Sequence, residues 1–363
     1  MKSLTTILLM LIMLLFCGNC TQKNRKIIGM KIYDYNGDFN ALVSKWKEMG
    51  INAAFISTTL AANDTFRHAL KKNKISSFII FPVFQNPEIL KRDSGLYAIT
   101  SKGTKAKDDW VEFVCPSRKI YRKAKIAELS DLIARLDPNG ISIDFIRQFV
   151  FWEMIYPDRA PESIDMACFC DSCLAGFSKE QGISIPDTCL TTKQKADYLV
   201  KNFSPAWDSY RCDLIATMVR DLSAKARQIK PGLIINVHAV PWRTQDFGGA
   251  EIRVAAQDLK KIYPYTNFIS PMCYSQMLKR NPGWVNDVVA DMDEHAHGMI
   301  LPSIQVYPYY IDYPFTPEDF RLCVREALKS PSRGVVFFSW PLFEKDPVRM
   351  KVVRDVIKSS KSL

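Results

Sequence analysis

The residues best suited to chemistry in this sequence lie between Gly140 and Cys173. The run from Gly140 to Asp144 is largely apolar and ends in a carboxylate, and Cys168, Cys170 and Cys173 follow it closely. An apolar alternating run predicts a buried strand. Barrel enzymes keep their catalytic groups at the carboxyl ends of such strands. The sequence therefore predicts a catalytic carboxylate at Asp144, near a cluster of thiols.

Asp144 and Glu153 are the predicted catalytic pair. A carboxylate in an apolar strand is costly unless it faces an open mouth or is paired, and Arg147 is the nearest cation along the chain. A structural Asp144–Arg147 ion pair is the alternative to a catalytic role. Glu153 lies among aromatic residues, where burial would raise its pKa and make it a proton donor at neutral pH. We expect Asp144 to act as nucleophile or as transition-state stabiliser.

Glycoside hydrolysis generally uses two acids, and the sequence offers other candidates for the second one. These are Asp34, Asp312 and Glu344, each of which follows a predicted strand. Polar and aromatic groups recur at the remaining strand ends, as sugar binding requires. The predicted substrate-binding residues are Arg147, Trp152, His238, Trp242, Tyr274, Gln305, Tyr307 and Trp340.

Four cysteines form the second group. Cys115 precedes a predicted helix, and Cys168, Cys170 and Cys173 lie within six residues of one another. Four thiolates fit a closed tetrahedral structural zinc site. Disulfide pairing is the alternative, which an oxidising compartment favours, although a Cys-x-Cys pair does not readily bond internally. We expect zinc and no organic cofactor.

Short β-rich runs alternate with amphipathic helical segments eight times along the chain, which predicts a (β/α)8 TIM barrel. The expected strands are Ile27–Tyr33, Ala53–Ser57, Ser77–Val83, Gly140–Phe145, Leu233–Ala239, Phe268–Met272, Met299–Val306 and Gly334–Phe338. The expected helices are Phe39–Met49, Phe66–Lys72, Tyr121–Leu136, Ala206–Gln228, Ile252–Lys261, Val285–His295, Pro317–Leu328 and Pro347–Lys358.

Two strand-to-helix connections are unusually long. They follow the third and fourth predicted strands and carry Cys115, Glu153 and the other three clustered cysteines. Long connections usually carry function, and both emerge at the same face of a barrel. The predicted domain organisation is a leader over 1–20, a tether over 21–26 and a single barrel domain over 27–360.

The N-terminal segment predicts export. Lys2 precedes an apolar run from Ile7 to Phe16 that is too short to span a bilayer comfortably. Cys20 resembles the lipidated cysteine of bacterial lipoproteins, although Asn19 departs from the usual small residue and Cys17 is a competing position. The alternative is a cleaved secretory peptide. We expect a lipid-anchored protein on the periplasmic or cell-surface side of a membrane.

The chain of 363 residues carries 49 basic and 38 acidic residues, a net charge of +11 that is scattered rather than gathered in one run. A protein without a basic stripe does not have the footprint of a nucleic-acid binder. A solvated basic surface explains the charge, and an acidic glycan or a membrane surface is the lesser alternative.

The sequence resembles TIM-barrel glycoside hydrolases, in particular hydrolase-like families of exported bacterial proteins. The four cysteines are similar to the zinc cluster of family 42 β-galactosidases, which implies a structural metal near the active-site rim. The strand ending at Asp144 resembles the fourth strand of the α-amylase and chitinase superfamilies, and Tyr274 is similar to a strand-six tyrosine of chitinases. Ser142 and Ile146 replace chitinase acids, and the Asn-Glu pair of family 42 is absent from this strand.

These features together predict an exported glycoside hydrolase that acts on a poly- or oligosaccharide. A non-catalytic glycan-binding barrel is the alternative, because the second carboxylate is the less certain of the pair. A zinc hydrolase is a weaker third hypothesis, since four cysteine ligands leave no open coordination position for water.

Overall fold

The computed structural model describes residues 26–360, so Cys20 and the rest of residues 1–25 lie outside it. Eight parallel strands form one sheet in the order β8-β7-β6-β3-β2-β1-β10-β9. Parallel bridges from Ile269 to Ile300 and from Met272 to Ser303 join the two edges. The predicted (β/α)8 barrel is confirmed. Its strands are β1 (Ile27–Ile32), β2 (Ala53–Ile56), β3 (Ser76–Pro82), β6 (Gly140–Asp144), β7 (Ile234–Ala239), β8 (Phe268–Pro271), β9 (Ser303–Gln305) and β10 (Gly334–Trp340).

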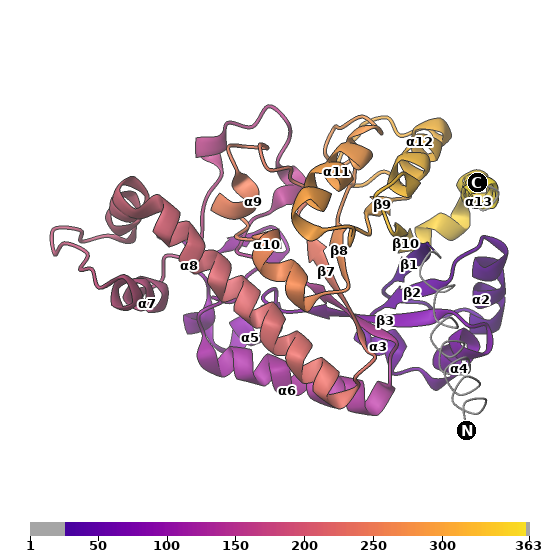
Figure 1. Cartoon of the computed structure of the whole chain (residues 1–363), viewed down its shortest axis with the longest axis horizontal. Helices are drawn as coiled ribbons and strands as arrows, with labels where there is room; N and C mark the ends of the chain where they lie inside the picture. The colour runs from indigo at the N-terminus through magenta and orange to yellow at the C-terminus, as the bar shows by residue number, and fades with distance from the viewer. Residues whose placement is uncertain (1–25, 361–363) are drawn as a thin grey trace, which may run out of the picture.

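Helices surround the strands, and α6 and α8 run along one side of the barrel (Figure 1). Within the described residues the α-helices are α2 (Phe39–Glu48), α3 (Thr58–Ala61), α4 (Asp64–Lys72), α5 (Pro87–Arg92), α6 (Lys119–Leu136), α7 (Asp171–Gln181), α8 (Thr192–Ile229), α9 (Ala250–Arg253), α10 (Leu259–Ile262), α11 (Trp284–Ala296), α12 (Pro317–Leu328) and α13 (Pro347–Ser360). None of the helices in this part of the chain is long and apolar enough to cross a membrane.

Three elements differ from the sequence prediction. Helix α8 extends well before Ala206, with a kink at Phe203 just before Pro205, because proline fits the first turn that follows the break. The predicted helix Ile252–Lys261 is instead the two short helices α9 and α10. Strand β9 is shorter than predicted because Pro302 has no N–H group to donate to a neighbouring strand.

The lower half of the barrel interior is apolar. Ala53, Phe55, Phe78, Ile80, Leu301 and Val336 form a separate buried cluster there. The rings of Phe55 and Phe78 stack with centroids 4.7 Å apart. A Cβ atom on Gly29 or Gly140 would lie 2.6 Å from one of these rings. Glycine at these two strand positions therefore makes room for the aromatic side chains that fill the barrel.

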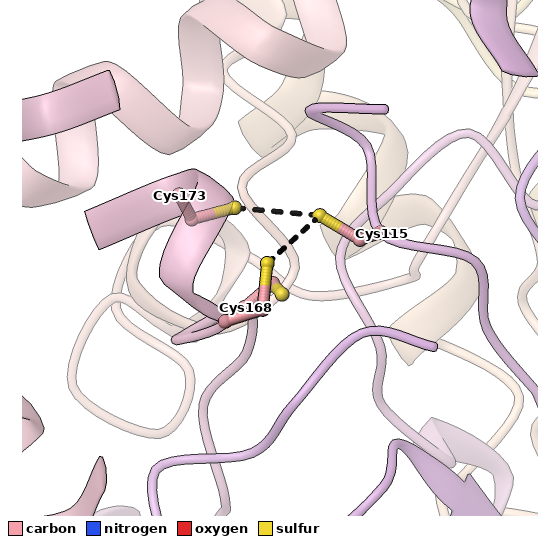
Figure 2. A group of neighbouring side chains, drawn as sticks. Cys115, Cys168 and Cys173 are labelled. Atoms are coloured by element: carbon pink, nitrogen blue, oxygen red, sulfur yellow. Dashed lines mark hydrogen bonds between the residues drawn. The ribbon is translucent and has the colours of Figure 1, made fainter. Parts of the chain in front are cut away.

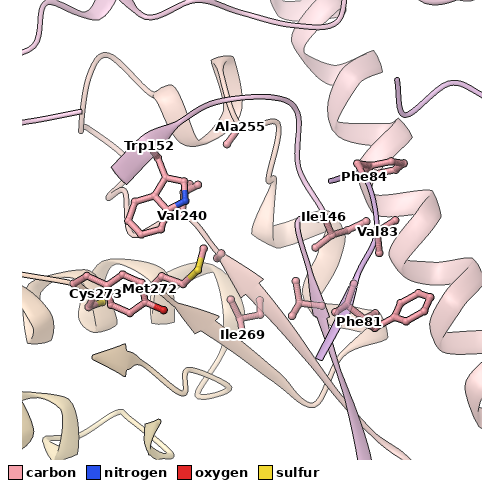
Figure 3. Close-up of a cluster of buried hydrophobic side chains, with 14 of the residues drawn as sticks. Phe81, Val83, Phe84, Ile146, Trp152, Val240, Ala255, Ile269, Met272 and Cys273 are labelled. Atoms are coloured by element: carbon pink, nitrogen blue, oxygen red, sulfur yellow. The ribbon is translucent and has the colours of Figure 1, made fainter. Parts of the chain in front are cut away.

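A larger apolar core lies between the strands and the helices. Figure 3 shows part of it, with Phe81, Ile146 and Ile269 beside the strands and Trp152 near Met272. Trp152 and Met272 also line a pocket at the carboxyl ends of the strands. This core consequently continues up to the floor of that pocket and fixes its position.

The two long connections contain structure of their own. The first, between β3 and α6, holds helix α5 and a small hairpin of β4 (Lys107–Asp108) and β5 (Val111–Glu112). The second, between β6 and α8, holds a 3-10 turn over Trp152–Met154 and helix α7, which lies away from the barrel (Figure 1). Thr100 of the first connection pairs with Ala167 of the second, so the two are held together above the strands.

Candidate active site

A pocket of about 350 Å3 opens at the carboxyl ends of the barrel strands. This volume is at the lower end of the range for small-molecule sites, which begins near ~300 Å3. Its charged lining residues are two carboxylic acids and two cations, Asp144, Glu153, Lys31 and Arg147. The remaining walls are mostly aromatic. The pocket therefore combines the groups for acid–base chemistry with flat apolar surfaces.

Asp144 is the last residue of β6, and its side chain is 7% exposed. Phe145, which follows, has a left-handed φ of 49°, so the chain turns sharply as it leaves the strand. The Phe145 backbone N–H donates to Asp144 Oδ1 over 2.7 Å, which fixes the carboxylate at the turn. Its negative charge opposes the lowering of the pKa of Lys31, Arg147 and His238 by burial, and it adds to the raised pKa of Glu153. Asp144 thus lies at the electrostatic centre of the pocket.

Glu153 approaches the same pocket from the 3-10 turn that follows β6. It is 7% exposed, and its Oε2 atom is buried without a hydrogen-bond partner. Burial raises the pKa of Glu153 to about 7, the nearby Arg147 opposes this rise, and the charge of Asp144 adds to it. A carboxyl group with this pKa holds its proton for a substantial fraction of the time at neutral pH, as a general acid requires.

Arg147 lies in the pocket wall without a carboxylate partner. Among residues 26–360 neither Arg147 nor Asp144 forms an ion pair, so the Asp144–Arg147 bridge considered as an alternative is not present. The guanidinium donates to the Gln148 carbonyl over 3.3 Å and lies over the rings of Phe113 and Phe145, 4.8 and 5.6 Å from their centroids. Burial lowers the pKa of Arg147 to about 10, so it stays charged at neutral pH.

Lys31 rises from β1 into the floor of the pocket. Its Nζ atom lies 3.2 Å from His238 Nδ1 and 3.2 Å from the Tyr274 hydroxyl. His238 Nε2 lies 2.7 Å from Ser142 Oγ, which also accepts from Asn236 over 2.9 Å. This network of side chains from β1, β6 and β7 forms a polar layer above the apolar interior.

The charge state of this layer follows from burial. Desolvation lowers the pKa of His238 to about 3 and that of Lys31 to about 8, and each effect is moderated by Asp144. At neutral pH the lysine is therefore an ammonium group and the histidine is neutral. A neutral His238 that accepts from Lys31 at Nδ1 carries its proton on Nε2 and donates it to Ser142.

Aromatic rings surround these charges in two tiers. Trp152 and Tyr274 are buried at the floor, with centroids 5.7 Å apart, and Tyr274 stacks on Phe338 at 4.8 Å. Trp110 and Tyr310 are exposed at the rim, where Trp110 Nε1 donates to the Tyr310 hydroxyl over 2.8 Å. The rim and the floor offer the stacking surfaces that sugar rings use.

Five of the ten predicted catalytic and substrate-binding residues line this pocket, namely Asp144, Glu153, Arg147, Trp152 and Tyr274. The others have different positions. His238 is one layer below. Gln305 donates to Gln276 over 2.8 Å and accepts from the Met277 N–H, so it supports a loop.

The remaining three predicted sugar contacts are aromatic residues outside the pocket. Trp242 is buried against Phe247, with centroids 5.6 Å apart. Trp340, the last residue of β10, is buried against α2, where its ring lies edge-on to that of Trp46 with centroids 5.8 Å apart. Tyr307 is exposed but does not contribute to the lining. Side chains alternate in direction along a strand, and a strand-end position alone does not say which way a ring points.

Several pocket residues were missed in the sequence. Lys31 carried the same signal as Asp144, a charge inside an otherwise apolar strand. Tyr309 and Tyr310 belong to the same aromatic run as the predicted sugar contact Tyr307. Trp110 gave no signal, because it enters the rim from the β4–β5 hairpin, whose position depends on the tertiary fold.

Cys115, Cys168, Cys170 and Cys173 form a buried cluster in which all four sulfur atoms lie within 4.8 Å of one another. Figure 2 shows the sulfur atoms of Cys115 and Cys173 facing each other, and they are 3.5 Å apart. Cys115 Sγ is 3.4 Å from Cys170 Sγ. A tetrahedral zinc ion with bonds of ~2.3 Å places its sulfur ligands ~3.8 Å apart, whereas a disulfide needs ~2.05 Å. The four thiols therefore fit a metal ion.

No protein-family model matches this sequence, and no curated protein sequence aligns significantly with it. Solved structures do share the fold. The glycoside hydrolase domain of PgaB (BpsB) from Bordetella bronchiseptica has a TM-score of 0.68 at 11% identity, over 92% of this chain and 98% of that one. A β-galactosidase from the Antarctic haloarchaeon Halorubrum lacusprofundi also gives 0.68 at 11% identity, over 93% of this chain.

A catalytic mutant of a family 42 β-galactosidase from G. stearothermophilus gives a TM-score of 0.62 at 12% identity, over 93% of this chain and 57% of that one. This chain likewise spans only 58% of the length of the haloarchaeal enzyme. At these identities the comparisons establish the fold. They confirm the resemblance to TIM-barrel glycoside hydrolases at that level.

Proposed function

We propose that this protein is a glycoside hydrolase that acts on a poly- or oligosaccharide. The observation that carries the proposal is the presence of Asp144 and Glu153 in one pocket, in environments that differ. Two carboxyl groups with different environments can divide the roles of acid and nucleophile between them. Similarity of fold to glycoside hydrolases supports this choice of reaction class.

In the proposed mechanism Glu153 donates its proton to the glycosidic oxygen as the bond to the anomeric carbon breaks. Asp144, held at the end of β6 by the Phe145 N–H, attacks that carbon or stabilises the positive charge that develops on it. Glu153 then accepts a proton from the water that completes hydrolysis. Lys31 and Arg147 lie within electrostatic reach of Asp144 and line the same pocket.

Turnover of a panel of oligosaccharides and nitrophenyl glycosides tests this assignment. We expect Asp144→Asn to abolish hydrolysis of both kinds of substrate. Glu153→Gln should slow the oligosaccharide by about 10²- to 10⁴-fold and the nitrophenyl glycoside much less, because nitrophenolate leaves without protonation. Glu344→Gln, a surface residue paired with Lys45, is the matched control and should change neither rate.

A non-catalytic glycan-binding protein is the competing outcome of the same experiment. It requires saturable glycan binding without turnover, and binding that Asp144→Asn leaves intact. Unchanged turnover in Asp144→Asn would remove the catalytic assignment altogether.

We further propose that Cys115, Cys168, Cys170 and Cys173 hold a structural zinc ion. The fit of four buried, closely spaced thiols to tetrahedral coordination supports the proposal. The ion would tie the β3–α6 connection to the β6–α8 connection, which carries Glu153. Metal analysis of the purified protein tests it, with one equivalent of zinc expected.

The N-terminal sequence supports export and lipid anchoring at Cys20, with residues 27–360 as one barrel domain. Mass spectrometry of the mature protein should find acyl chains on an N-terminal Cys20. A mature chain without acyl groups would leave export by a cleaved peptide. Fractionation of cells should place the anchored protein in the membrane fraction.

A further inference from the structure

Neither cation of the pocket forms an ion pair within the described residues, although the charge of Asp144 acts on both of them from a greater distance. Within residues 26–360 the structure has three buried arginines, Arg147, Arg211 and Arg349. Arg211 pairs with Asp208 at 2.9 Å, and Arg349 pairs with Asp346, in each case an aspartate three residues earlier. Arg147 also has an aspartate three residues earlier, Asp144, but does not pair with it.

The unpaired state of Arg147 is energetically unusual. Moving a guanidinium out of water costs several kcal/mol unless an opposite charge compensates it. The rings of Phe113 and Phe145 offset part of that cost, about 0.5–2 kcal/mol for each contact. The Nη2 atom still has no hydrogen-bond partner. A buried charge kept in this condition at a pocket wall indicates a function that requires it.

Lys31, the other cation of the lining, repeats the pattern. The residue is 1% exposed, and the partners of its ammonium group are the neutral His238 and the hydroxyl of Tyr274. No carboxylate of the described chain lies within ion-pair distance of it. An ammonium group has three donors, so one of them remains for a ligand.

The charges of the lining therefore do not cancel when the site is ready to react. Lys31 and Arg147 contribute two positive charges, and Asp144 contributes one negative charge. Glu153 contributes none while it holds the proton that the proposed reaction needs. A neutral sugar would leave one positive charge buried in the occupied pocket, whereas a sugar with a single carboxylate would balance it.

We propose that the sugar unit recognised by this pocket carries a carboxylate, as in a uronic acid, and that Arg147 is the residue that selects it. The inference rests on the proposed function and specifies its substrate class. A planar guanidinium matches a carboxylate by two parallel hydrogen bonds. The aromatic floor and rim would hold the sugar ring while Arg147 and Lys31 attract its acidic group.

Matched glycans test the proposal. Oligogalacturonate, oligomannuronate and a glucuronate-containing oligosaccharide would each be compared with the same oligosaccharide after reduction of its carboxyl groups to primary alcohols. Binding would be measured by calorimetry on the Glu153→Gln protein, in which hydrolysis is slowed, position 153 stays neutral and Asp144 keeps its charge. We expect at least one acidic form to bind ten or more times tighter than its reduced form.

Variants of Arg147 then identify the selecting residue. Arg147→Met should remove the preference and Arg147→Lys should keep part of it. Arg135→Met removes an exposed charge at the end of α6 and should leave the preference unchanged, which controls for net charge. If Arg147→Met does not fold, the comparison of acidic and reduced glycans on the protein that retains Arg147 still decides the question.

The outcomes separate this inference from the proposed function. Preference for the acidic form without turnover by the wild-type protein supports the inference and contradicts the hydrolase. Turnover together with equal or tighter binding of the reduced forms overturns the inference and keeps the hydrolase. Absence of binding to every pair overturns the inference as well.

Discussion

Replacing Glu153 by glutamine should stabilise the fold at alkaline pH while slowing the hydrolysis of oligosaccharides. Burial raises the pKa of this carboxyl group from 4.5 to about 7. Between these two values the folded protein binds a proton that the unfolded chain has released. Stability therefore falls as pH rises through this interval, because the unfolded state binds fewer protons there.

The size of the effect follows from the two pKa values. A difference of this size corresponds to about 3 kcal/mol, and linkage assigns about 2.5 kcal/mol of it to the interval from pH 5 to pH 8. Glutamine cannot ionise, so the Glu153→Gln variant should lack this loss. Relative to wild type, the free energy of unfolding of the variant should therefore increase by about 2 to 3 kcal/mol between pH 5 and pH 8.

Urea denaturation of both proteins at pH 5 and pH 8 measures this shift. Glu344→Gln is the control, because its carboxylate is partly exposed and pairs with Lys45 at the surface, where such pairs contribute about 0–1 kcal/mol. If the free energies of unfolding of Glu153→Gln and wild type differ by the same amount at pH 5 and pH 8, the reasoning is refuted. Such a result would mean that Glu153 is not desolvated, and its role as proton donor would lose its physical basis.

Three further predictions concern the cysteine cluster, the pocket rim and the pairing of β1 with β10. Cys170→Ala should remove bound zinc and destabilise the protein by about 3 kcal/mol or more. Cys189→Ala, which changes a cysteine outside the cluster, should retain the metal. Metal analysis and thermal melting of both variants test this prediction. Trp110→Ala should weaken glycan binding about five- to tenfold, through loss of about 1 kcal/mol of stacking, with the melting temperature nearly unchanged because Trp110 is 39% exposed. Gly334→Ala should destabilise the fold by about 3 kcal/mol or more. Gly334 has a φ of +145°, and a Cβ atom there would lie 1.9 Å from the Ile27 carbonyl oxygen. Gly232→Ala, whose Cβ atom would meet nothing within 4 Å, should be nearly neutral when both variants are compared by urea denaturation.

The sequence alone was sufficient for the architecture. Strand and helix periodicity repeated eight times, which is the number of strand–helix pairs in a closed parallel barrel. The apolar run that ends at Asp144 marked the end of its strand through local chemistry. Cysteine spacing likewise anticipated a cluster, because Cys168, Cys170 and Cys173 are close in the chain whatever the fold.

Only the tertiary structure decided which side chains share the pocket. Trp340 ends β10 and Tyr309 follows β9, yet the first is buried against Trp46 and the second lines the site. Trp110 reaches the rim from a hairpin more than thirty residues away from Asp144 in the chain. Periodicity reports which residues are apolar, whereas the direction of a ring at a strand end depends on packing against elements that are distant in sequence.

The charge balance of the site also required three-dimensional structure. The sequence presented Asp144 and Arg147 at the same spacing as the paired Asp208 and Arg211, and nothing local distinguishes the two cases. Asp208 and Arg211 lie on one helix, where side chains three residues apart lie on the same face. Asp144 ends a strand and Arg147 follows a left-handed turn at Phe145, so the same spacing leaves the two charges apart.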